Sequence, residues 1–224
     1  MAGSSATRHH RVQLPLMILN PMINSPIVDP YVEVMLAFRD LLEEAKSSAD
    51  PEPTAMYLST MDDDHRLSCR AVLLKAHDER GFVFYTNTDS RKGHELQTHP
   101  HCALLFHWRH LRNGVQVRIE GRAEPVSDEE ADRYFASRPR MSQIGAWASD
   151  QSRTLESRDV FEARVAEVEA RFENQTVTRP PQWSGYRVVP DRIELWFGAE
   201  FRLHERFVYE RAQTGVWSKR MLFP

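Results

Sequence analysis

The feature that most constrains the fold of this chain is a long series of short β-type segments. Each is rich in apolar, β-branched or aromatic residues, and turn sequences such as Asn113-Gly114 separate several of them. We predict strands over residues 55–61, 68–75, 81–87, 102–108, 115–124, 185–189, 192–197, 202–211 and 216–222. Because strands joined by short turns pair as antiparallel neighbours, the pattern indicates a mainly β (α+β) chain, an antiparallel barrel with peripheral helices.

Helix signals are fewer, and most of them are N-terminal caps. A polar side chain ahead of an apolar repeat satisfies backbone N–H groups that the first turn of a helix leaves free. We predict helices that begin after Asp29, Ser90 and Ser127, and a longer one over residues 158–173. Residues 1–28 show no periodicity and are expected to form a mobile arm, whereas residues 29–224 are expected to form one domain.

Composition excludes several classes of function. The chain has 224 residues and a formal net charge of −3, so it lacks the global positive field that attracts nucleic acid or anionic lipid. No apolar run approaches the roughly 18–20 residues that span a bilayer. The two cysteines, Cys69 and Cys102, are expected to be buried thiols in a reducing cytoplasm, which is also the predicted location of the protein.

Four histidines lie close together in the sequence without forming a metal motif. Their spacing matches no standard ligand pattern, and we therefore predict no metal site. These residues are His99, His101, His107 and His110.

The segment RLHER alternates in a way that favours a ligand-binding face. In a β-strand, side chains at i, i+2 and i+4 point to the same side, which would align Arg202, His204 and Arg206. Three cation-capable groups side by side repel one another unless an anion or a polar ring lies against them. We therefore expect a ligand on this face.

A second candidate for anion binding is the predicted helix start at Arg91 and Lys92. Cations in a first turn oppose the helix macrodipole at a cost of roughly 0.3–1 kcal/mol each. A bound phosphate reverses that sign, because free N–H groups and two cations then converge on it. The alternative is a solvated pair that tolerates the penalty. Arg70 and Lys75 bracket the apolar run AVLL; on a flat strand they would face opposite ways, as ordinary edge charges.

The remaining polar residues indicate phosphorylated small molecules rather than a covalent nucleophile. The chain has no Gly-rich dinucleotide fingerprint, no P-loop and no Gly-x-Ser-x-Gly elbow. Instead, Arg, Lys, Ser, Tyr and Gln residues gather near strand ends, and residues 134–152 surround a small apolar island at 144–148 with such side chains.

At these positions the sequence resembles the pyridoxine/pyridoxamine 5′-phosphate oxidase family. The resemblance spans about residues 29–224, in order and at similar spacing. Its motifs are RAVLLK at 70–75, FYTN and SRKG within 84–93, VQVRIEG at 115–121, YFASRPRMSQIGAWASDQS at 134–152, WSGYRV at 183–188 and RLHER at 202–206.

The resemblance implies an FMN-binding split β-barrel that forms a homodimer with two FMN sites at the subunit interface. It implies oxidation of pyridoxine or pyridoxamine 5′-phosphate to pyridoxal 5′-phosphate, with dioxygen reduced to hydrogen peroxide. The residues implied to hold FMN are Arg70, Ala71, Val72, Leu73, Leu74, Lys75, Tyr85, Thr86, Arg91, Lys92, Gln116, Gln151, Ser152, Trp196 and Arg206. The substrate phosphate would be held by Lys75, Tyr134, Arg138 and Ser142, while Arg202 and His204 would lie over the pyridine ring as catalytic residues.

Some positions depart from the family pattern and bear on substrate choice. Phe197 stands where glutamine is usual in the family. Relative to the family pattern, Asn113-Gly114 looks like a two-residue insertion just before Gln116. Two alternatives follow: a related FMN oxidase of phenazine biosynthesis, and a flavin- or heme-binding split-barrel protein without turnover. A substrate without phosphate would not need Tyr134, Arg138 and Ser142, and a carrier would not need these three together with Arg202 and His204.

Overall fold

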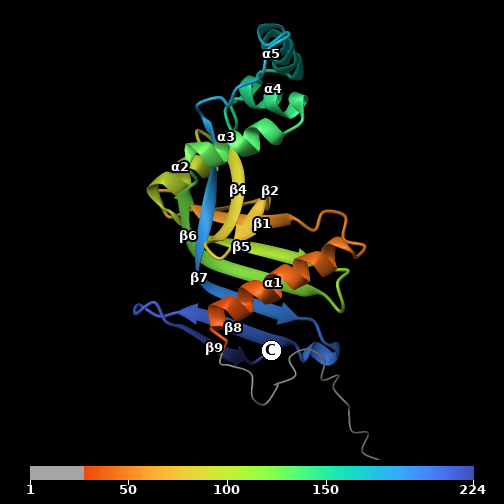
Figure 1. The fold of residues 1–224 in the computed structure, drawn as a ribbon, viewed down its shortest axis with the longest axis vertical. Helices are drawn as coiled ribbons and strands as arrows, with labels where there is room; N and C mark the ends of the chain where they lie inside the picture. Colours follow the sequence, from red (N-terminus) through yellow and green to blue (C-terminus); the bar gives the residue numbers. More distant parts are fainter. Residues whose placement is uncertain (1–27) are drawn as a thin grey trace, which may run out of the picture.

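The computed structural model describes residues 28–224 as one curled antiparallel sheet with helices around it (Figure 1). The predicted arm at residues 1–28 lies outside the described residues, apart from Val28. The strands are β1 (Ala55–Met61), β2 (Leu67–Leu73), β3 (Ala76–Asp78), β4 (Gly81–Asn87), β5 (His101–Trp108), β6 (Val115–Pro125), β7 (Trp183–Phe197), β8 (Glu205–Arg211) and β9 (Trp217–Leu222). The helices are α1 (Pro30–Lys46), α2 (Arg91–Thr98), α3 (Asp128–Ser137), α4 (Arg140–Ala148) and α5 (Arg158–Arg171), with a 3₁₀ turn η1 (Glu200–Arg202). The predicted mainly β architecture with peripheral helices is confirmed.

The strands follow the order β2-β1-β5-β6-β7-β4-β3, and β8 pairs with β7 and β9. Strand β7 organises the sheet: β4 pairs with its first half, β8 with its second half, and β6 with nearly all of it. We predicted two strands here, but β7 is continuous over 15 residues. The register with β6 shifts between Glu120 and Gly121, opposite Pro190 and Asp191. A bulge accommodates a proline, which has no N–H to give to the ladder.

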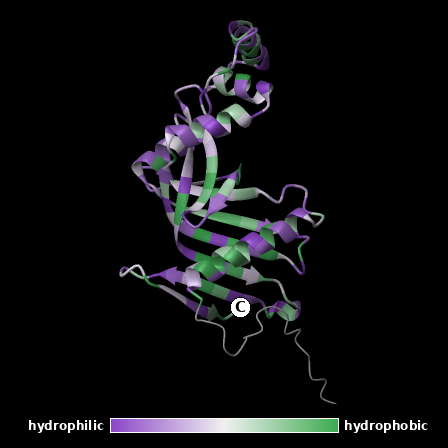
Figure 2. Cartoon of the chain, in the orientation of Figure 1, coloured by the Kyte–Doolittle hydropathy of each residue, from purple (hydrophilic) through white to green (hydrophobic). Residues whose placement is uncertain are grey.

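Helix α1 covers the inner face of the sheet, where the main core lies. Asp29 caps it through its side chain, as predicted. Phe38 is fully buried and makes edge contacts with the rings of Phe82 and Phe106, at centroid distances of 4.9 and 5.2 Å. Hydrophobic and hydrophilic residues alternate along the strands beside it, as Figure 2 shows. This alternation is the period of two from which the sheet was predicted.

A smaller core lies under helices α3, α4 and α5, which stack beyond one end of the sheet (Figure 1). Its buried residues include Phe135, Ile144 and Trp183. The predicted helix start after Ser127 is confirmed, since the Ser127 hydroxyl accepts from the Glu130 N–H at 3.2 Å. Helix α4 was not predicted: the apolar island at 144–148 belongs to a helix that begins at Arg140.

The two cysteines differ from our expectation. Cys69 is exposed, and Cys102 is partly buried, with a thiol pKa raised to about 12 by burial. No helix within residues 28–224 has the length and apolar composition that a membrane span requires.

Candidate functional site

Polar groups converge where β4 ends and α2 begins. The Ser90 hydroxyl caps α2 by accepting from the Gly93 N–H at 3.3 Å, which places Arg91 and Lys92 in the first turn, as predicted. The turn after α4 reaches the same place, because the Arg91 N–H donates to the Ser152 hydroxyl at 3.2 Å. We call this group the phosphate cluster; it comprises Arg70, Thr86, Arg91, Lys92, Gln151 and Ser152.

The Lys92 ammonium is the centre of this cluster. It donates to the Thr86 hydroxyl and to the Gln151 side-chain carbonyl, both at 2.9 Å. The pKa of Lys92 is lowered to about 8, mainly by burial. The nearby charge of Arg70 also lowers this pKa, and the charge of Glu95 raises it by a smaller amount. A cation that is partly stripped of water beside other cations is stabilised by an anion, so the donor set fits a phosphate.

Arg70 contributes to the cluster from an inward-facing position. Its terminal nitrogens donate to the Leu58 carbonyl at 3.1 Å and to the hydroxyls of Thr60 and Ser68. They also lie 3.3 Å from the carboxylate of Glu95, which is only 4% exposed. We expected Arg70 and Lys75 to face opposite ways on one strand; instead, Lys75 lies just after β2, exposed, with its backbone N–H bonded to the Val83 carbonyl.

The predicted apolar contacts of FMN, residues 71–74, lie at the end of β2 and just beyond it. Burial there is uneven, since Leu74 is buried and Leu73 is exposed. Ala71 pairs with Tyr57 of β1, and Val72 with Met56.

A second group lies near the other end of β7. Gln116, Trp196 and Arg206 are direct neighbours across β6, β7 and β8, so their side chains point to one face of the sheet. Arg206 donates to Glu194 at 2.8 Å, and the Glu194 carboxylate is 2% exposed. Burial alone would raise the pKa of Glu194, but the hydrogen bond from Arg206 and the nearby arginine charges lower it. We call Gln116, Trp196, His204 and Arg206 the ring cluster.

The strand geometry that we predicted for RLHER is wrong. Arg202 belongs to η1, and β8 begins only at Glu205. Phe201 and Arg202 have φ values of 55° and 62°, left-handed conformations that turn the chain and end the alternation. His204 still reaches the ring cluster: its ring centroid lies 4.5 Å from that of Trp196. Its Nδ1 accepts from the Ala199 N–H at 3.1 Å, which leaves the ring proton of a neutral imidazole on Nε2.

A third group gathers around an aromatic stack. The rings of Tyr85, Tyr134 and Trp183 are nearly parallel, and the Tyr85 centroid lies 4.1 Å from that of Tyr134 and 5.3 Å from that of Trp183. The Arg138 guanidinium lies 4.8 Å from the Trp183 centroid, and its Nη1 is buried without a hydrogen-bond partner among the described residues. Burial lowers the pKa of Arg138. An unpaired buried guanidinium nitrogen is costly, and an oxyanion would satisfy it. Ser142 lies in the first turn of α4, two residues beyond Arg140.

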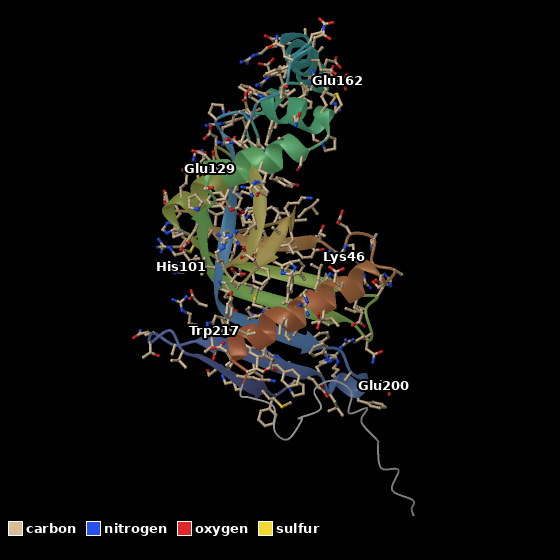
Figure 3. All side chains as sticks on the ribbon, in the orientation of Figure 1. Lys46, His101, Glu129, Glu162, Glu200 and Trp217 are labelled. Atoms are coloured by element: carbon tan, nitrogen blue, oxygen red, sulfur yellow. The ribbon has the colours of Figure 1, made fainter. Side chains whose placement is uncertain are left out.

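The phosphate and ring clusters are far apart within one chain. Thr86 pairs with Ser184, which lies twelve residues before Trp196 on β7. An extended strand rises roughly 3.3 Å per residue, which gives about 40 Å of strand between the two positions. Figure 3 shows the long shape of the molecule, with Glu162 of α5 and Glu200 of η1 near opposite ends.

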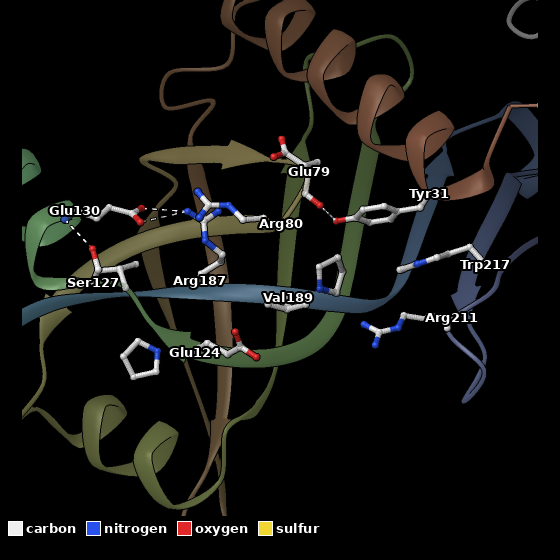
Figure 4. A pocket seen from close by; sticks show the side chains of 14 residues that line it. Tyr31, Glu79, Arg80, Glu124, Ser127, Glu130, Arg187, Val189, Arg211 and Trp217 are labelled. Atoms are coloured by element: carbon white, nitrogen blue, oxygen red, sulfur yellow. Dashed lines mark hydrogen bonds and ion pairs between the residues drawn. The ribbon is translucent and has the colours of Figure 1, made fainter.

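A cleft of about 810 Å³ lies elsewhere, between α1, the β3–β4 turn, α3 and the β8–β9 hairpin (Figure 4). It contains none of the predicted site residues. Its central cation, Arg187, is already neutralised: it lies 3.1 Å from Glu130 in the cleft and 2.6 Å from Asp78, which is not a lining residue. The size of this cleft therefore does not identify it as the site.

Comparison with known sequences identifies the family. Residues 41–172 match the sequence model described as pyridoxamine 5′-phosphate oxidase, and residues 183–224 match the pyridoxine 5′-phosphate oxidase C-terminal dimerisation region. The chain belongs to the pyridoxamine 5′-phosphate oxidase family. A pyridoxine/pyridoxamine 5′-phosphate oxidase of Xanthomonas euvesicatoria is 59% identical over 88% of this chain and 100% of its own length. One from Myxococcus xanthus is 51% identical over 98% of this chain and 96% of its own.

Solved structures agree on the split-barrel fold. PhzG of Burkholderia lata, solved with tetrahydrophenazine-1-carboxylic acid, has a TM-score of 0.80 at 31% identity, over 93% of this chain and 98% of that one. A pyridoxamine 5′-phosphate oxidase-related, FMN-binding protein of Nostoc punctiforme has a TM-score of 0.68 at 16% identity, over 84% of this chain and 96% of that one, and supports the fold alone.

Sequence reasoning missed the two buried carboxylates that hold the cations of the site. Glu95 follows Arg91 by four residues, the spacing at which helical side chains meet, and this signal was available in the sequence. Glu194 precedes Trp196 by two residues on β7, so strand parity would have placed it on the same face.

Proposed function

We propose that the protein is an FMN-dependent oxidase that converts pyridoxine 5′-phosphate or pyridoxamine 5′-phosphate to pyridoxal 5′-phosphate. The observation that carries this proposal is the buried Nη1 of Arg138, which has no hydrogen-bond partner within residues 28–224 and lies beside the Tyr85–Tyr134–Trp183 stack. This arrangement offers an oxyanion partner next to aromatic faces, as a phosphorylated pyridine requires. Relatives that are 51–59% identical and carry that name support the same substrate class.

The cofactor phosphate fits the phosphate cluster. Lys92 and Arg91 provide charged donors in the first turn of α2, and Thr86, Gln151 and Ser152 provide neutral ones. Bound FMN would accept a hydride from the C4′ carbon of the substrate and pass the electrons to dioxygen. The protein's part is to place that carbon and to exclude other orientations.

Arg202 and His204 are proposed to act on the substrate ring. Arg202 offers a fixed charge and a planar fork that resists reorientation. The hydrogen bond from Ala199 leaves Nε2 of His204 as the donor, suited to polarise the substrate hydroxyl or amine.

We also propose that the working form is a homodimer with FMN between the subunits. About 40 Å of β7 separates the two ends that are expected to contact FMN, so one cofactor would take its phosphate cluster and its ring cluster from different chains. The dimerisation-region match over residues 183–224 supports this, because that region contains Trp196 and Arg206.

The test is anaerobic mixing of the FMN-loaded protein with pyridoxamine 5′-phosphate. We expect the yellow flavin absorbance to bleach and to return when air is admitted, with pyridoxal 5′-phosphate as the product. Unphosphorylated pyridoxamine is the control and should bleach the flavin far less. Bleaching by tetrahydrophenazine-1-carboxylic acid instead would favour the phenazine activity suggested by the PhzG likeness. A flavin that stays oxidised with every donor would refute the oxidase.

A further inference from the structure

Glu95 is the most buried charged group next to the phosphate cluster, and its contacts come from three elements. Arg91 on the same helix donates to it at 2.7 Å, and Ser68 of β2 donates to it at 2.8 Å. Thr60 of β1 donates through its hydroxyl, and Arg70 of β2 lies 3.3 Å away. Burial alone would raise the pKa of Glu95, but the hydrogen bonds from Thr60, Ser68 and Arg91 lower it. The carboxylate is therefore ionised.

The position of Glu95 determines where two cations lie. It accepts from the Nε of Arg91, so that this side chain runs along α2 to the next turn of the helix, and it lies 3.3 Å from Arg70, whose charge acts on Lys92. A buried carboxylate with this many donors is strongly restrained, because each displaced contact would leave a charge unpaired.

Charge counting involves the same residue. Arg70, Arg91 and Lys92 carry three positive charges, against one negative charge on Glu95 and another on Asp62, which lies 3.6 Å from Arg91. The cluster keeps a net positive charge, which favours a phosphomonoester, and the Glu95 charge is part of that balance.

We infer that Glu95 is a positioning residue for the cofactor phosphate: it holds Arg70 and Arg91 in place and sets the charge of the cluster. This inference rests on the proposed function, because it assumes that a flavin phosphate binds there. It predicts an effect specific to the phosphate, which a general contribution to folding would not produce.

The experiment compares FMN with riboflavin, which lacks the phosphate. Flavin-fluorescence titrations of the cofactor-free protein would measure both dissociation constants in the wild type and in Glu95→Gln. We expect FMN affinity to fall about tenfold or more, the effect of misplacing a charge-assisted hydrogen bond, while riboflavin affinity changes little. Asp78→Asn is the matched control: it disrupts the ion pair with Arg187 outside the phosphate cluster and should leave the FMN-to-riboflavin ratio unchanged.

Three results would overturn the inference. Equal losses for FMN and riboflavin would mean that Glu95 only stabilises the fold. Tighter FMN binding would mean that the added net positive charge outweighs any positioning, and unchanged FMN binding would mean that Glu95 does not position the cations. Equal affinities of the wild-type protein for riboflavin and FMN would mean that no site for the phosphate exists, and would also contradict FMN as the proposed cofactor.

Two further measurements apply if Glu95→Gln folds poorly. Ser68→Ala keeps the charge of Glu95 but removes one donor to its carboxylate, and should give a smaller loss of affinity that is again confined to FMN.

The second measurement is the pH profile of FMN binding in any folded Glu95 variant. The groups around Lys92 are Arg70, Glu95 and the polar side chains of Thr86, Ser90 and Gln151. The charge of Glu95 raises the pKa of Lys92, so its loss should make FMN affinity fall at a lower pH than in the wild type. A fall at the same pH in both proteins would contradict the inference.

Discussion

Raising the pH should weaken FMN binding through a single group, Lys92. Its pKa is lowered to about 8 by burial, with Arg70 adding to that effect and Glu95 opposing it. In the free protein Lys92 therefore loses its charge as the pH rises through about 8. In the complex the negative charge of a bound phosphate would keep Lys92 protonated to higher pH. Between pH 7 and pH 9 the protonated fraction of Lys92 in the free protein falls from about nine-tenths to about one-tenth. The dissociation constant should rise about tenfold, or roughly 1.4 kcal/mol of binding free energy.

Fluorescence titration of the cofactor-free protein with FMN at several pH values from 7 to 9 would measure this slope. The phosphate itself ionises near pH 6, so its charge is nearly constant across this range. Lys92→Arg keeps its charge at every pH used and should give a flat profile, even if its affinity is lower. Riboflavin should also show no slope in the wild type. The reasoning fails if the wild-type FMN profile is flat, or if Lys92→Arg keeps the same slope.

Three other outcomes follow from the described contacts. Arg138→Ala should raise the KM for pyridoxamine 5′-phosphate by a factor that corresponds to roughly 2–3 kcal/mol of binding free energy, with FMN still bound. Steady-state kinetics would measure this, and an unchanged KM would show that Arg138 does not bind the substrate. Arg202→Ala should keep FMN but lose most of kcat/KM, more severely than His204→Ala; wild-type efficiency in both would refute their assignment to the substrate ring. Phe38→Ala empties a fully buried position under α1 and should lower the free energy of unfolding by about 3–5 kcal/mol in urea titrations, whereas a change below 1 kcal/mol would contradict the packing described here.

Much of the fold was predictable because its signals are local. Alternation along β1, β5 and β6, the apolar run of β4, and caps such as Ser90 and Ser127 depend on neighbouring residues, so these strand and helix positions followed from the sequence. The continuity of β7 did not follow, since Pro190 is a break signal unless a partner strand provides a bulge opposite it.

The site was less predictable, because its geometry depends on long-range contacts and on unusual backbone angles. Phe201 and Arg202 adopt left-handed conformations, which usually require glycine. Neither residue type signals such a conformation, so the alternation in RLHER predicted a strand. Lys92 and Gln151 are 59 residues apart in sequence and meet only after folding. The roles of individual residues came from the family resemblance and stay predictions.

The length of β7 has a genetic consequence if the dimer is as proposed. A chain with Lys92→Ala and a chain with Arg206→Ala would each be inactive alone, because each lesion spoils both sites of its homodimer. Mixed in one cell, the two chains would form heterodimers in which one site carries both lesions and the other carries neither. With random assortment, about a quarter of all sites would be intact, so two null alleles would complement each other within a single gene.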